Sequence, residues 1–100
     1  MPTTLHVDFT SVRNHNERAV HEAVLRQADR YPGLMHNPEL LADVACVALN
    51  RLPPRYIRHE VDFSFYLTEH ERLEIDNAIV DAVAYAFNFV QARTALRARK

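Results

Sequence analysis

The sequence predicts a mainly α-helical fold: a small domain of three helices, the last of them long, with short extended segments between them. Three stretches carry apolar residues at helical spacing, and each opens on a side chain suited to capping a helix. The single glycine and most of the prolines lie at the edges of those stretches. With 100 residues, 48% of them hydrophobic and 25% charged, the chain has the size and composition of one globular domain, which we assign to residues 1–100.

The N-terminal segment and the first helix come next in order. Residues 5–9 alternate apolar and polar side chains, which is typical of a short strand or an extended arm. Asn14, with Glu17 three positions later, predicts the start of a helix over about 15–30. That helix carries one apolar stripe, and Tyr31-Pro32-Gly33 ends it because the residue before a proline is disfavoured in helical geometry.

The second helix is predicted over about 38–51. Asn37 supplies a capping side chain, Pro38 suits the first helical position, and Glu39 places a negative charge in the first turn. Pro53-Pro54 prevents the helix from continuing.

Residues 57–67 alternate again, so we predict an extended segment there and leave open whether it pairs as a strand. Thr68 and Glu71 then form a Thr-x-x-Glu capping box, which opens a long helix without proline or glycine as far as Lys100.

The last helix is apolar over more than half of its circumference. One face carries residues such as Ile75 and Ile79, and a second face beside it carries Val80, Val83, Phe87 and Val90. Two preceding helices are not enough to cover both faces. We therefore predict that the second face forms the contact of a homodimer. A chain of this size also buries only about 60–70% of the surface that its unfolded form exposes, which favours a dimer.

Charge and composition limit the partners. The formal net charge is −1 and the pI about 6.6, so the chain lacks the global basic field that attracts duplex DNA. A lone cysteine fits a reducing compartment, residues 1–10 lack the pattern of a signal peptide, and no run approaches the ~18 apolar residues of a membrane span. We expect a cytoplasmic protein that does not enter membranes.

The residues that usually carry catalysis or bind metals do not fall into recognised patterns. The six histidines and Cys46 show none of the HExxH, CxxC or HxxxH spacings of a local zinc site, so we expect no metal and no other cofactor. Cys46 lies in the middle of a predicted helix, and one glycine cannot make a glycine-rich phosphate loop. We expect that the protein is not an enzyme.

A cluster around the double proline offers a candidate ligand site. Arginine forks bind phosphate oxygens and stack on bases, and an aromatic ring adds a second stacking surface. The cluster consists of Asn50, Arg51, Arg55, Tyr56 and Arg58. The alternative interpretation is structural: Arg51 caps carbonyls, Tyr56 packs its ring, and the two prolines simply fix a corner of the chain.

The same stretch resembles the signature of the late competence protein ComFB family, an aspartate followed by a small apolar helix and A-L-N-x-L-P-P-x-Y. It stands here as Asp43-Val44, Ala48-Leu49-Asn50 and Leu52-Pro53-Pro54-Arg55-Tyr56. The resemblance implies a small dimeric protein, and some members of the family are receptors for cyclic dinucleotides. Some also carry a cysteine cluster before the aspartate that resembles a zinc site. This chain has Met35, His36 and Asn37 there, so that zinc site is expected to be absent.

The resemblance and the arginine cluster together lead to one hypothesis. The chain is expected to be a cytoplasmic homodimer that binds a cyclic dinucleotide, cyclic di-GMP or cyclic di-AMP, and relays the signal to an unidentified protein. The chemistry of the side chains assigns phosphate to Arg51 and Arg55, base contacts to Tyr56 and Arg58, and polar support to Asn50. The alternative is a dimeric helical adaptor without a small ligand, linked to competence or to cell-surface regulation.

Overall fold

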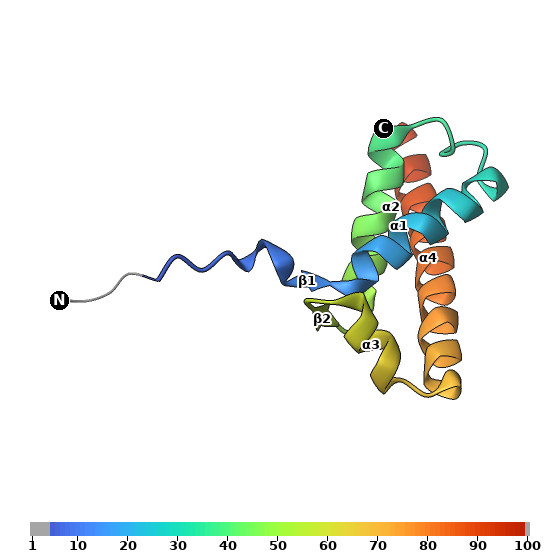
Figure 1. Ribbon diagram of the computed structural model, residues 1–100. Helices are drawn as coiled ribbons and strands as arrows, with labels where there is room; N and C mark the ends of the chain where they lie inside the picture. Colours follow the sequence, from blue (N-terminus) through green and yellow to red (C-terminus); the bar gives the residue numbers. More distant parts are fainter. Residues whose placement is uncertain (1–4, 100) are drawn as a thin grey trace.

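The computed structural model describes residues 5–99 and shows a mainly helical fold, as predicted (Figure 1). Met1–Thr4, the start of the segment without a signal-peptide pattern, and Lys100 lie outside the described residues. The α-helices are α1 (His15–Gln27), α2 (Pro38–Arg51), α3 (Glu60–Tyr66) and α4 (Glu69–Ala98). Two short 3-10 helices accompany them, Phe9–Ser11 and Ala28–Arg30, and a two-stranded antiparallel sheet joins β1 (Arg13–Asn14) to β2 (Tyr56–Ile57).

The three predicted helix starts are confirmed by their caps. The Asn14 side chain accepts a hydrogen bond from the Asn16 amide, and the Asn37 side chain accepts from Glu39 and Leu40. Thr68 forms the full capping box with Glu71 at the start of α4. Each cap satisfies amides that have no partner inside the helix, which explains why the elements begin where they do.

The prediction of an extended segment over 57–67 is wrong for most of its length. Only Tyr56–Ile57 pairs as a strand, and Glu60–Tyr66 forms α3. Because β2 pairs only with the two residues of β1, a longer strand here would leave its amides without partners, whereas one helical segment satisfies them internally. Arg72 of α4 reinforces α3 by donating a hydrogen bond to the Ser64 carbonyl over 2.8 Å.

The arm before α1 was predicted as a strand or an extended arm. Residues 5–8 have no regular secondary structure, and Phe9–Ser11 is a 3-10 turn capped by the Asp8 side chain. In Figure 1 this segment projects away from the helices. The arm is therefore extended, but it is not a strand.

The core lies where α1, α2 and α4 meet. Figure 1 shows α2 running beside α4 while α1 crosses them. Among the described residues, thirteen buried apolar side chains form this core, most of them Val and Ala. The small side chains let the helices approach closely, and Phe87 is the largest of the fully buried residues.

The predicted subunit face of α4 must be corrected in part. Val83, Phe87 and Val90 are 0% exposed in the single chain, whereas Val80 is 45% exposed. The connector after α1 covers more of α4 than the sequence suggests, because Tyr31 stacks on Phe87 with ring centroids 4.3 Å apart. Three of the four residues thus belong to the core of the chain itself and offer no surface to a second subunit.

In the described part of the chain, no helix combines the length and the apolar character that crossing a membrane requires.

Candidate ligand site at the β2–α3 corner

The double proline forms a corner that is fixed to the start of α1. The Asn16 side chain is 3% exposed and donates from Nδ2 to the Pro53 carbonyl over 2.9 Å. The Arg55 amide donates to Asn14 Oδ1 over 3.0 Å, and the His15 amide donates to the Arg55 carbonyl over 2.6 Å. These bonds join segments nearly 40 residues apart in sequence, so the backbone of the corner has a defined position.

A hollow of about 360 Å³ opens beside this corner, between β2 and α3. Two guanidinium groups, an imidazole and three aromatic rings border it. Tyr56 and Tyr66 are 68% and 80% exposed, so their rings are accessible to a ligand. The residues that line the hollow are Arg55, Tyr56, Ile57, Arg58, His59, Phe63, Tyr66 and Leu67.

Three of the five predicted ligand residues meet in this hollow: Arg55, Tyr56 and Arg58. Arg58 also donates from Nε to Ser11 Oγ over 3.4 Å, which links it to the end of the arm. Cations bind phosphate oxygens and rings stack on bases, so this group has the chemistry of a nucleotide site.

The other two predicted residues lie outside the hollow. The guanidinium carbon of Arg51 is 3.7 Å from the centroid of the Tyr85 ring, on α4. Asn50 donates from Nδ2 to the Cys46 carbonyl one turn earlier in α2. Both side chains therefore make contacts within the helical body, and the structure does not bring them to the corner.

Five residues of the hollow were not predicted, and three of them carry rings: His59, Phe63 and Tyr66. An alternating pattern places Phe63 and Tyr66 on opposite sides of a strand, whereas in α3 their spacing of three places them on the same face. Phe63 also stacks on His15 of α1, with ring centroids 4.1 Å apart. The sequence signal that could have identified these residues is their helical spacing directly before the Thr68 cap.

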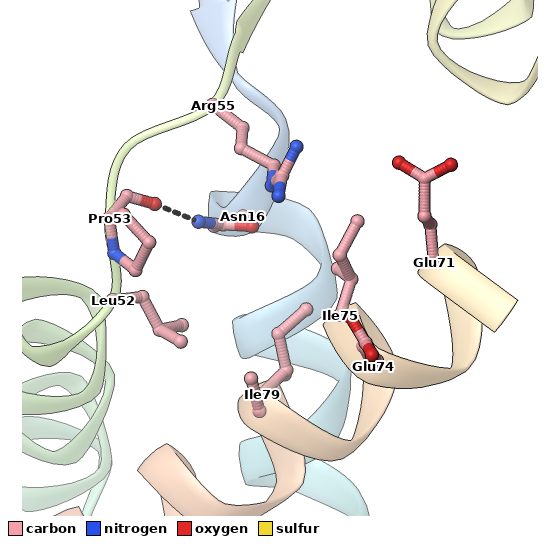
Figure 2. Close-up of a pocket in the computed structure, with 9 residues that line it drawn as sticks. Asn16, Leu52, Pro53, Arg55, Glu71, Glu74, Ile75 and Ile79 are labelled. Carbon is pink, nitrogen blue, oxygen red and sulfur yellow. Dashed lines mark hydrogen bonds between the residues drawn. The ribbon is translucent and has the colours of Figure 1, made fainter. Parts of the chain in front are cut away.

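Arg55 also lines a second, smaller hollow of about 190 Å³ between the corner and α4. In Figure 2 its guanidinium extends past Asn16 toward the first turns of α4, where Glu71 and Glu74 also line the hollow. Hydrogen bonds from the Thr68 amide and hydroxyl, and then the positive charge of Arg55, lower the pKa of Glu71 below its usual value. Glu71 is therefore ionised near neutral pH and borders the same hollow as the arginine.

A third hollow, about 550 Å³ and mostly apolar, runs between α1 and α2 on the outer surface. Leu25, Leu41, Ala45 and Leu49 contribute apolar surface, and Asn50 lies at its border. Exposed apolar area of this kind is typical of protein contacts.

Within residues 5–99, no three His, Cys, Asp or Glu side chains converge in a group that could hold a metal. At the position of the cysteine cluster of some ComFB proteins, Asn37 is the cap of α2 and accepts two backbone hydrogen bonds. The residues present there do not fit a zinc site.

Residues 13–94 match the family described as late competence development protein ComFB. The chain belongs to the ComFB family. The match contains α1, α2, α3, the corner and α4 as far as residue 94, whereas the projecting arm precedes it. No significant match to the chain was found among curated proteins or among solved structures.

The structure gives the ComFB signature a structural role. Asp43 accepts a hydrogen bond from Arg93 over 3.0 Å, which joins α2 to α4. Asn50 caps a carbonyl of its own helix, and the Pro53 carbonyl holds Asn16. Arg55 and Tyr56 are the signature positions that reach the hollow of about 360 Å³.

Proposed function

We propose that this ComFB protein is a non-enzymatic receptor for a cyclic dinucleotide, cyclic di-GMP or cyclic di-AMP, and that it relays the signal to a protein partner. The observation that carries the proposal is the convergence of Arg55, Arg58, Tyr56 and Tyr66 around one hollow at a corner with a fixed backbone. The arginines bind phosphate oxygens, and the tyrosine rings stack on the bases. The family membership supports the same proposal.

The size of the hollow supports a dimeric receptor. About 360 Å³ is near the lower end of the roughly 300–1,000 Å³ of small-molecule sites, so one chain suits one base and its phosphate rather than a whole dinucleotide. A cyclic dinucleotide has two equivalent halves, and a two-fold homodimer presents the same residues twice. The second copy therefore completes the site. Val83, Phe87 and Val90 are excluded from that contact by their burial.

The second candidate is a dimeric helical adaptor that binds no small ligand. The apolar hollow between α1 and α2 favours it, because Leu25 there is 71% exposed and has the character of a protein-contact residue. In this case the signature serves only to fix the corner, and the relevant surface is on the opposite side of α2 from α4.

Titration calorimetry separates the two candidates. The protein at tens of micromolar is titrated with cyclic di-GMP and, separately, with cyclic di-AMP, and light scattering measures its mass before and after. Saturable heat with either ligand, at one ligand per two chains, supports the receptor. A stable dimer that gives no heat with either ligand supports the adaptor.

A further inference from the structure

Arg55 is shared between the two hollows beside the corner. Its side chain lines both the hollow bordered by aromatic rings and the smaller hollow facing α4. Its backbone is held on both sides, because its amide donates to Asn14 and its carbonyl accepts from His15. The preceding Pro54 restricts the chain further. Only the side chain is therefore able to move between the two hollows.

The smaller hollow presents negative charge to this arginine. Among its lining residues, Arg55 is the only basic one, whereas Glu71 and Glu74 are acidic. Figure 2 shows the guanidinium directed into this space. From the other side, the Arg55 guanidinium carbon is 5.9 Å from the centroid of the Phe63 ring. The arginine thus lies within reach of two environments with different charge.

The two carboxylates differ in how they are held. Glu71 accepts hydrogen bonds at Oε1 from the Thr68 amide over 3.2 Å and from the Thr68 hydroxyl over 2.9 Å, so its carboxylate has a fixed position. Glu74 pairs with His70 on the same helix, with 2.8 Å between Nε2 and Oε1. Glu71 is therefore the more constant anionic neighbour of Arg55.

We propose that Glu71 holds the Arg55 side chain toward α4 in the ligand-free protein and competes with the ligand phosphate for it. The inference rests on the proposed function, and it makes Glu71 a residue that sets the affinity of the site without touching the ligand. A ligand that needs Arg55 in the hollow between β2 and α3 binds only those protein molecules in which the arginine side chain points into that hollow. The apparent affinity of the protein for the ligand is the intrinsic affinity multiplied by the fraction of such molecules. Such a competitor keeps the receptor empty at low messenger concentration.

The first test needs no ligand. NMR titration of the Glu71 carboxyl carbon is compared between the unmodified protein and Arg55→Ala. We expect the pKa of Glu71 to rise in Arg55→Ala, while the Thr68 hydrogen bonds keep it below that of an unrestrained glutamate. An unchanged Glu71 titration would overturn the proposal.

The second test is the affinity of Glu71→Gln for cyclic di-GMP and cyclic di-AMP. Glutamine at this position retains the capping box, so α4 keeps its start. Loss of the Glu71 charge, which lines the same hollow as Arg55, is expected to tighten binding roughly three- to tenfold at low salt. In 1 M salt the Debye length is only about 3 Å, so the gain should shrink.

Two controls separate this contact from a general change in charge. Glu69→Gln removes the same charge in the same helical turn, but Glu69 lines neither hollow. An equal gain from Glu69→Gln would overturn the proposal, as would a gain from Glu71→Gln that persists in the Arg55→Ala background. If the unmodified protein binds neither nucleotide, the proposed receptor function fails, and the carboxyl titration alone decides whether Glu71 holds Arg55.

Discussion

The guanidinium carbon of Arg51 lies 3.7 Å from the centroid of the Tyr85 ring, which joins the last turn of α2 to α4. Four positions later, Arg55 lies at the corner and lines the candidate ligand site. Two arginines of one short motif thus have different surroundings, and we infer different roles for them. Arg51 contributes to the helical body, whereas Arg55 is available to a ligand.

Arg51→Ala should therefore lower stability and leave ligand affinity nearly unchanged. Loss of an exposed cation–π contact costs roughly 0.5–1 kcal/mol. For a domain of this size that lowers Tm by about 2–8 °C. Thermal unfolding followed by circular dichroism measures the shift, and calorimetry measures the affinity. A tenfold loss of ligand affinity in this variant would show that Arg51 does belong to the ligand site.

Arg55→Ala should show the reverse behaviour. A charge-assisted hydrogen bond to phosphate contributes roughly 1.5–3 kcal/mol, so affinity for the cyclic dinucleotide should fall about ten- to a hundredfold. The backbone bonds of Arg55 to Asn14 and His15 do not involve its side chain, so the cost to folding stability should be below about 1 kcal/mol. A sharp drop in Tm with unchanged affinity would show that Arg55 only stabilises the corner.

The sequence was sufficient for α1, α2 and α4 but not for α3 or for the site. Caps at Asn14, Asn37 and Thr68 mark the observed helix starts because capping is a local interaction between neighbours in sequence. The ends of α2 and the break at Pro53-Pro54 follow from the same local rules.

The candidate site depends on contacts that local rules do not contain. Which of Arg51 and Arg55 reaches the hollow is decided by the ring of Tyr85 and by the bond between Asn16 and Pro53, both distant in sequence. The helix α3 was missed because its apolar residues satisfy alternation as well as helical spacing, and only the shortness of β1 decides between them. The burial of Phe87 depends in the same way on the connector residue Tyr31.

Phe87→Ala should destabilise the chain instead of producing a folded monomer. Phe87 is 0% exposed and stacks on Tyr31, so truncation should cost roughly 3–5 kcal/mol. Denaturant unfolding measures this loss. Val80→Ala on the same helix is the matched control, since Val80 is 45% exposed and its truncation should cost well under about 1 kcal/mol. A folded, monomeric Phe87→Ala protein of normal stability would restore the predicted subunit face.

The capping box of α4 should make stability depend on acid pH. Hydrogen bonds from Thr68, and then the charge of Arg55, lower the pKa of Glu71 in the folded protein. A lowered folded-state pKa contributes stability that is complete above the unfolded value of about 4.3 and is lost as pH falls through the folded value. Melting curves between pH 7 and pH 3 should therefore converge with those of Glu71→Gln at the acid end. A constant difference between the two proteins at every pH would show that ionised Glu71 adds nothing.

Asn16→Ala should weaken both the fold and the ligand site, because one buried amide positions the corner. The variant leaves the Pro53 carbonyl without the Asn16 Nδ2 donor, and loss of a buried hydrogen bond of this kind costs about 1–3 kcal/mol. Arg55 follows Pro53 by two residues, so a corner that moves relative to α1 also displaces the Arg55 guanidinium. Affinity for the ligand should therefore fall, even though Asn16 does not line the proposed ligand hollow. Asn50→Ala is the matched control, since the exposed Asn50 amide hydrogen-bonds to Cys46 within α2 and lines neither hollow beside the corner, so its loss should change neither quantity appreciably. If Asn16→Ala lowers stability but leaves cyclic-dinucleotide affinity intact, the position of the corner is not what orients Arg55 toward its ligand.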